Sequence, residues 1–190
     1  MTGFGSRIGE TAALLQSLAT PDIVRRVESA VDLLCRVVKE RKPLLVCGNG
    51  GSASDALHIS GELVGRFLIE RAPIDVICLN ANVSVLTAWS NDYDYASVFA
   101  RQVEAHGRVG GVLWGISTSG NSGNVVSAFE AARRLGMHTL ALTGAGGGRL
   151  AAQADVLIDV PSRSTPRIQE MHLPIYHYIC EELEKRTSSV

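Results

Sequence analysis

Five short apolar runs, separated by segments with helical spacing, constrain the fold of this chain more than any other feature. Near-continuous apolar runs are typical of strands that are covered on both faces. Because helical segments separate the runs, we expect an α/β fold in which a five-stranded parallel sheet is flanked by helices. The expected strands are residues 44–47, 75–79, 112–116, 139–142 and 156–160.

A long amphipathic segment precedes the first run. Between Pro21 and Lys39 apolar residues recur with helical period, and Thr20 can cap this segment. We therefore expect residues 1–41 to form an N-terminal helical segment. Residues 42–190 are expected to form the parallel α/β core with a C-terminal helix, in the same single domain. The long helix can pack on its own sheet or form a subunit interface, and the sequence leaves both possibilities open.

Composition argues against several partners and locations. The 18 basic and 19 acidic residues give a net charge of −1 without a basic stripe, so we expect no nucleic-acid partner. No apolar run approaches the ~20 residues that span a bilayer, so we expect no membrane partner. No N-terminal stretch resembles a signal peptide. We expect a cytoplasmic protein whose four cysteines are buried free thiols: Cys35, Cys47, Cys78 and Cys180.

The motif Ser-Thr-Ser-Gly-Asn-Ser at residues 117–122 lies where an apolar run passes into a helical pattern. Unpaired backbone N–H groups and a positive helix dipole make such a turn suitable for an anion. Hydroxyl groups add hydrogen-bond donors without charge, which suits a phosphate monoester. An ordinary helix cap is the alternative, but a cap needs only one hydroxyl.

A second loop, Gly-Asn-Gly-Gly-Ser-Ala at residues 48–53, formally matches the dinucleotide motif G-x-G-x-x-G/A. A dinucleotide site also needs an acidic residue at the end of the second strand, where Asn80 is found instead. The loop therefore favours a small phosphorylated or hydroxylated ligand over NAD.

Two helical segments carry residues suited to chemistry. His58 and Glu62 are spaced i, i+4 on one helical face, which fits metal binding and acid–base catalysis. The C-terminal helix carries Gln169, His172 and His177. Gln169 and His172 share a face, whereas Gln169 and His177 lie roughly 12 Å apart along a regular helix. Spacing alone does not choose between the two histidines, one of which we expect to be structural.

Together these stretches resemble the phosphoheptose isomerase family, which has the sugar-isomerase (SIS) fold. The resemblance runs from about Thr20 to the end of the chain. It implies an aldose–ketose isomerase that converts sedoheptulose 7-phosphate to D-glycero-D-manno-heptose 7-phosphate through an enediol. This reaction would feed bacterial heptose biosynthesis for lipopolysaccharide, capsule or S-layer glycan. The motifs that carry the resemblance are residues 48–53, 58–62, 90–93, 117–122 and 167–172.

The resemblance also implies roles for individual residues and a homotetramer with active sites at subunit interfaces. It implies Glu62 and His177 as the catalytic pair and one zinc ion per subunit, bound by His58, Glu62, Gln169 and His177. The implied substrate-binding residues are Asn49, Gly50, Gly51, Ser52, Glu62, Asn91, Asp92, Ser117, Thr118, Ser119, Ser122 and Gln169.

One departure and one alternative accompany the resemblance. Residues 145–148, Ala-Gly-Gly-Gly, replace a more polar turn of the family. The alternative is a non-catalytic SIS-domain regulator that binds the replication initiator DnaA. That subgroup lacks the catalytic pair, whereas Glu62 and His177 are both present here, which favours the enzyme. The sequence does not assign the acid and the base.

Overall fold

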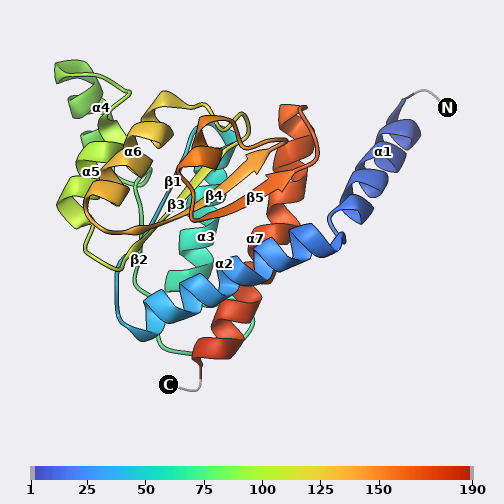
Figure 1. Ribbon diagram of the computed structural model, residues 1–190, viewed down its shortest axis with the longest axis horizontal. Coiled ribbons are helices and arrows are strands. Elements are labelled where there is room, and N and C mark those ends of the chain that lie inside the picture. Colours follow the sequence, from blue (N-terminus) through green and yellow to red (C-terminus); the bar gives the residue numbers. More distant parts are fainter. Residues whose placement is uncertain (1–2, 189–190) are drawn as a thin grey trace.

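The structure, a computed structural model, describes residues 3–188 and contains the predicted parallel sheet (Figure 1). The strands lie in the order β2-β1-β3-β4-β5, and each neighbouring pair is parallel. The α/β fold class predicted from the apolar runs is confirmed. The strands are β1 (Leu44–Gly48), β2 (Val76–Cys78), β3 (Val112–Ser117), β4 (His138–Gly144) and β5 (Val156–Val160).

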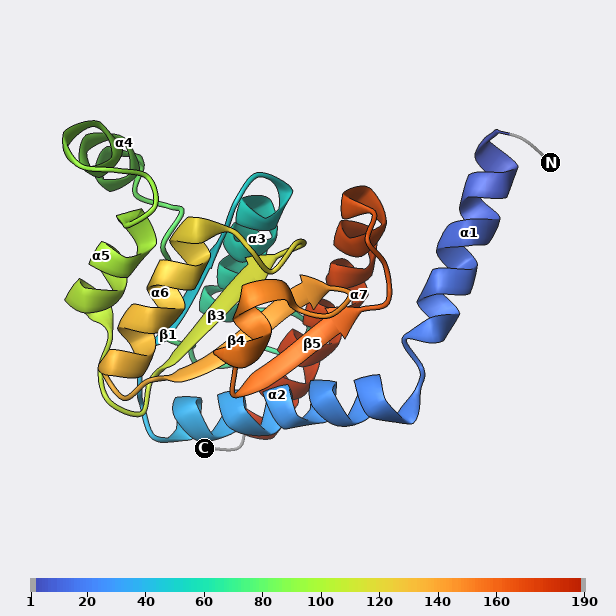
Figure 2. The same cartoon turned by 45° about the horizontal axis from the view of Figure 1, so that its top comes forward.

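Helices cover both faces of the sheet. They are α1 (Phe4–Ser17), α2 (Pro21–Lys39), α3 (Gly51–Val64), α4 (Val83–Asp92), α5 (Val98–His106), α6 (Gly123–Arg134), the 3₁₀ helix η1 (Gly148–Ala152) and α7 (Thr165–Thr187). Figure 2 shows α2, α3 and α7 on one side of the sheet and α5 and α6 on the other.

This two-sided cover explains the continuous apolar runs. Along β1, Leu44 and Val46 belong to the core formed with α2, α3 and α7, whereas Leu45 and Cys47 belong to the core formed with α5 and α6. All four side chains are fully buried. The cysteines Cys35, Cys47, Cys78 and Cys180 are buried free thiols, as predicted. Within residues 3–188, no helix combines the length and the apolar character needed to cross a membrane.

The long amphipathic segment forms α2 with the predicted bounds. Its apolar face, which includes Val27, Val31 and Leu34, packs against α7 and β5, so this helix does pack on its own sheet. Helix α1 precedes it, buries no side chain and projects away from the sheet (Figure 2). From the sequence we expected helical structure over residues 1–41, but we did not predict that it forms two separate helices.

A buried ion pair fixes the chain that follows α3. Arg71 Nε lies 3.2 Å from Glu184 Oε1, and the two side chains are 3% and 0% exposed. Glu184 accepts hydrogen bonds from the N–H groups of residues 67, 68 and 69, while Arg71 donates to the carbonyl oxygens of Glu62 and Leu63. Burial raises the pKa of Glu184, but these hydrogen bonds and Arg71 outweigh burial and lower it. Because Arg71 also bonds to two carbonyl oxygens at the end of α3, the pair fixes the last turn of this helix, which carries Glu62.

Replacing Glu184 with glutamine is expected to destabilise the fold by about 3–5 kcal/mol, because Arg71 would be left as an uncompensated buried charge. Urea unfolding followed by circular dichroism measures this change. The matched control is Glu181→Gln, since Glu181 lies on the same helix and pairs with Lys185 near the surface. Equal unfolding midpoints for the two variants would show that the buried pair contributes little.

Candidate active site

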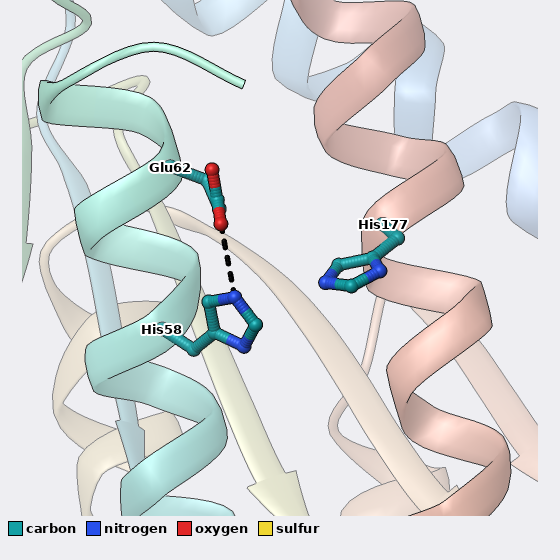
Figure 3. Close-up of side chains that lie close together, drawn as sticks. All are labelled: His58, Glu62 and His177. Atoms are coloured by element: carbon teal, nitrogen blue, oxygen red, sulfur yellow. Dashed lines mark hydrogen bonds and ion pairs between the residues drawn. The ribbon is translucent and has the colours of Figure 1, made fainter. Parts of the chain in front are cut away.

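Helices α3 and α7 bring three ionisable side chains together on one side of the sheet. His58 and Glu62 lie one turn apart on α3, and His177 faces them from α7 (Figure 3). One potential ligand atom from each of these residues lies within 4.8 Å of the other two. His58 Nε2 is 2.9 Å from Glu62 Oε1, and the two side chains are 42% and 22% exposed. We call His58, Glu62 and His177 the α3–α7 cluster.

His177 is held beside the α3 pair by ring contacts. Its imidazole lies edge-on to that of His58, with 5.1 Å between ring centroids, and the Phe67 ring lies 5.3 Å away. Burial lowers the pKa of His177, the nearby His58 lowers it further, and Glu62 opposes the shift. A lowered pKa favours the neutral imidazole, which is the form that binds a metal or accepts a proton. His177 Nε2 is buried and has no hydrogen-bond partner among residues 3–188.

The structure separates the two histidines that spacing alone could not. His172 is fully buried, and its Nε2 lies 3.2 Å from the carbonyl oxygen of Thr143 on β4. Burial lowers its pKa to about 4, although the interaction with Thr143 opposes the shift, so His172 is neutral at pH 7. His172 is therefore the structural histidine that the sequence led us to expect, and His177 is the one that joins His58 and Glu62.

Gln169 lies on α7, and its side chain contacts the start of α3. Its amide approaches Gly51 so closely that a Cβ atom built there would lie 2.4 Å from Nε2. Gly51 begins α3, and His58 follows two turns later, about 10 Å along the helix axis. The structure thus brings together three of the four expected metal ligands and places Gln169 beside the first turn of α3. Gln169 would have to leave Gly51 to reach an ion at the cluster.

The serine-rich loop at residues 117–122 follows β3, at the carboxyl edge of the sheet. The hydroxyls of Ser117 and Ser122 lie 2.9 Å apart, and Ser119 Oγ accepts a hydrogen bond from the N–H of Asn121. Ser122 is the N-cap residue of α6, yet its side chain makes no capping hydrogen bond. The alternative of an ordinary helix cap therefore does not explain the Ser122 hydroxyl. The hydroxyl groups of this loop remain suited to binding a phosphate.

The turn at residues 144–148 supports this loop by backbone contact. The N–H of Gly144 donates to the carbonyl of Thr118, and a Cβ atom at Gly120 would lie only 2.0 Å from the carbonyl oxygen of Gly147. Gly120 and Gly147 also have φ angles of 65° and 68°, in the left-handed region that favours glycine. Gly120 therefore allows the two backbones to touch. Gly148, one of the glycines that depart from the family pattern, does the same, because a Cβ atom there would lie 2.5 Å from the carbonyl oxygen of Ser119.

The loop at residues 48–52 is held by side-chain amides. Asn80 Oδ1 accepts from the N–H of Gly48 at 3.1 Å, and Asn80 Nδ2 donates to the Gly48 carbonyl at 2.9 Å. Asn80 thus extends the pairing of β1 with β2 beyond the end of β2. A dinucleotide site would need an acid at this position, where the structure has an amide bonded to the backbone of Gly48.

Asn124 and Tyr95, which the sequence analysis did not select, connect the two loops through Asn49. Asn49 and Asn124 exchange amide hydrogen bonds of 2.7 and 2.9 Å, and the Tyr95 hydroxyl donates to Asn49 Oδ1 at 2.8 Å. Asn124 is 4% exposed in the first turn of α6, and a polar residue in an otherwise apolar helical face was the available signal.

Asn91 and Asp92 lie apart from the α3–α7 cluster. They end α4, where the Asn91 amide donates to the Asp92 carboxylate at 2.9 Å, and both are exposed. Figure 2 places α4 beyond α5, across the sheet from α7. Within residues 3–188 of one chain, the structure does not join these two expected substrate contacts to the α3–α7 cluster.

Two further residues surround His58. The Tyr176 hydroxyl lies 2.9 Å from His58 Nδ1, and Asp55 precedes His58 by one turn of α3. Burial raises the pKa of Asp55 to about 6, while His58 and the Tyr176 hydroxyl oppose the shift. The sequence analysis did not select either residue, because their roles depend on the packing of α7 against α3.

Comparison with known proteins agrees with this architecture. Residues 9–144 match the family described as SIS domain. The chain is 49% identical to a phosphoheptose isomerase of Synechocystis over 84% of this chain and 82% of the relative. It is 48% identical to one of Helicobacter pylori strain P12 over 91% of this chain and 89% of the relative.

A solved structure of the phosphoheptose isomerase from Neisseria gonorrhoeae superimposes with a TM-score of 0.90 at 39% identity, covering 95% of this chain and 96% of that one. The sequence relatives and this structure all carry the isomerase name, so the comparisons favour the enzyme over the DnaA-binding regulator. The chain belongs to the phosphoheptose isomerase family of SIS-domain proteins.

Proposed function

We propose that this chain interconverts sedoheptulose 7-phosphate and D-glycero-D-manno-heptose 7-phosphate, as an aldose–ketose isomerase of heptose biosynthesis. The observation that carries the proposal is the α3–α7 cluster. Two of its residues lie on α3, which starts at one of the two loops suited to a phosphorylated sugar. The product heptose would enter lipopolysaccharide, capsule or S-layer glycan.

The donor set of the α3–α7 cluster fits one zinc ion per subunit. Two imidazoles and a carboxylate are common zinc ligands, and the unpaired, buried Nε2 of His177 supports this assignment. His58, Glu62 and His177 would hold the ion, and Gln169 would supply the fourth ligand after moving away from Gly51. When bound, zinc supplies a Lewis acid for the negative charge that develops on the substrate oxygens.

Glu62 and His177 would move the proton between C1 and C2 of the sugar. The reaction removes a proton from one carbon, passes through an enediol and returns a proton to the other carbon, so it needs a base and an acid. Glu62 Oε1 lies beside His58, which leaves Oε2 for proton transfer. The lowered pKa of His177 favours the neutral imidazole. Because Glu62 and His177 would also hold the ion, one of them would have to exchange off the ion during turnover to act as acid or base.

The two loops would bind the rest of the substrate. The phosphate would be held by Ser117, Thr118, Ser119 and Ser122 of the serine-rich loop, together with Ser52 of the first loop. The sugar hydroxyls would contact Asn49, Gly50, Gly51, Glu62 and Gln169. Asn91 and Asp92 would line the pocket from a neighbouring subunit, since α4 lies across the sheet from α7 within one chain.

Replacing Ser119 with alanine is expected to raise KM and to leave kcat nearly unchanged. The lost hydroxyl would contact a phosphate remote from the reacting carbons, and such a hydrogen bond contributes about 1–3 kcal/mol. Steady-state kinetics measure both constants. The control is Ser127→Ala, because Ser127 lies on α6 with its hydroxyl bonded to its own helix. An unchanged KM would mean that this loop does not hold the phosphate.

We further propose a cytoplasmic homotetramer with active sites at subunit interfaces. Exposed apolar side chains flank the α3–α7 cluster, and α1 buries no side chain within its own chain. A second subunit would cover these apolar surfaces and exclude water from the site. The exposed apolar residues on and just after α3 and on α7 are Leu57, Val64, Leu68 and Leu173.

The decisive experiment incubates the purified protein with sedoheptulose 7-phosphate, with zinc added in one sample and removed by a chelator in another. We expect an aldoheptose 7-phosphate to form with zinc and without nicotinamide, and its rate to fall after chelation. No turnover with zinc present, together with binding to an initiator protein, would favour the regulator and exclude the isomerase.

A further inference from the structure

Tyr176 contacts two of the three residues of the α3–α7 cluster, His58 and His177. It lies on α7, is 1% exposed, and its hydroxyl is 2.9 Å from His58 Nδ1. Its ring is edge-on to the rings of His58 and His177, with centroid distances of 5.4 and 5.0 Å. Within residues 3–188, no other group forms a hydrogen bond with His58 Nδ1.

This hydrogen bond fixes which way the His58 ring faces. With Nδ1 directed at Tyr176, Nε2 is directed at Glu62, 2.9 Å away. Rotation of the ring by 180° about χ2 would move both nitrogens off these partners. The Tyr176 hydroxyl therefore selects the ring orientation in which Nε2 belongs to the cluster.

A hydroxyl suits this place because its oxygen both donates and accepts hydrogen bonds. When His58 Nε2 binds a metal, the neutral ring carries its hydrogen on Nδ1 and needs an acceptor there. The Tyr176 oxygen is the neighbouring acceptor, and its own hydrogen then needs a new partner. Asp55 provides one, since its Oδ2 is buried beside Tyr176 without a hydrogen-bond partner in the described chain.

We propose that Tyr176 is a positioning residue that orients His58 as a metal ligand by accepting its Nδ1 hydrogen and donating to Asp55. Outer partners of this kind hold a ligand in one tautomer and one ring orientation, and their loss typically lowers metal affinity about 10–100-fold. The inference rests on the proposed metal site at the α3–α7 cluster.

Tyr176→Phe tests the inference because it keeps the buried ring and removes only the hydroxyl. The matched control is Tyr178→Phe, two residues further along α7, where the hydroxyl bonds to Glu28 instead of the cluster. Zinc affinity is measured by competition with a chromophoric chelator, and the visible spectrum of the cobalt-loaded protein reports ligand geometry. We expect Tyr176→Phe to bind zinc about 10–100-fold more weakly and to show an altered cobalt spectrum. Tyr178→Phe should match the wild type.

The outcomes separate this inference from the proposed function. A wild-type protein that binds no zinc would remove the metal site and the inference with it. Tight zinc binding by the wild type and by Tyr176→Phe, with identical cobalt spectra, would overturn the inference and leave the proposed metal site in place.

A measurement on the wild type covers the case in which Tyr176→Phe does not fold. In the zinc-loaded protein, nuclear magnetic resonance should detect a slowly exchanging, downfield Nδ1 hydrogen on His58, assigned by its absence in His58→Gln. A His58 Nδ1 hydrogen that exchanges rapidly with water would overturn the inference.

Discussion

Replacing His177 with alanine is expected to lower turnover about 10²–10⁴-fold and to weaken zinc binding. The substitution removes both a proton-transfer group and one ligand atom of the α3–α7 cluster. Metal content after dialysis and kcat with saturating zinc are measured on the folded protein. The two readouts separate the roles, because excess zinc can compensate for weak binding but cannot replace a missing acid or base.

Two histidine variants serve as controls for this prediction. His138→Ala removes a half-exposed imidazole at the start of β4, remote from α3, and should leave both readouts unchanged. His172→Ala should lower stability, because the site is fully buried, while the folded fraction keeps its zinc. If His172→Ala loses the metal and His177→Ala keeps it, the ligand assignment on α7 is wrong.

Replacing Glu62 with glutamine is expected to lower kcat by about 10²–10⁴-fold, because an amide cannot accept the proton that a carboxylate accepts. The glutamine keeps the size of the side chain and an oxygen for His58, so the fold of α3 should be retained. We would measure kcat at saturating zinc and substrate, together with exchange of the C1 or C2 hydrogen with deuterium from solvent.

The control for Glu62 is Glu70→Gln, because the Glu70 side chain is 91% exposed and pairs weakly with Arg66. It removes one carboxylate near the end of α3 without touching the cluster. Should Glu62→Gln retain wild-type kcat and wild-type hydrogen exchange, the base must be another group, and His177 would be the remaining member of the proposed pair.

The sheet could be predicted from the sequence because a strand that is buried on both faces has apolar residues at successive positions. Residues 44–47, for example, are apolar at every position because alternate side chains enter different cores. Both loops were predicted to lie at the carboxyl edge of the sheet because expected strands and helices alternate along the chain, and each loop follows a strand. The bounds of α2 were predicted for a similar reason, since none of its polar residues is buried and its apolar residues therefore recur with helical period.

The site was less accessible to this reasoning because its contacts join distant parts of the chain. His172 and His177 are separated by about 140° around a helix at 100° per residue, so they cannot share one face. Which of them faces α3 depends on how α7 lies against the sheet. Tyr176 reaches His58 across 118 positions, and Asn124 reaches Asn49 across 75, so periodicity within one segment contains no trace of either pair.

The reciprocal amide pair between Asn49 and Asn124 has a consequence for ligand affinity. With Tyr95, it restricts the loop after β1 and the first turn of α6 to one arrangement. The conformational entropy of these segments is therefore lost when the protein folds and not when a sugar phosphate binds. A small ligand with few atoms to contribute binding energy then needs to offset little more than its own loss of translational and rotational freedom.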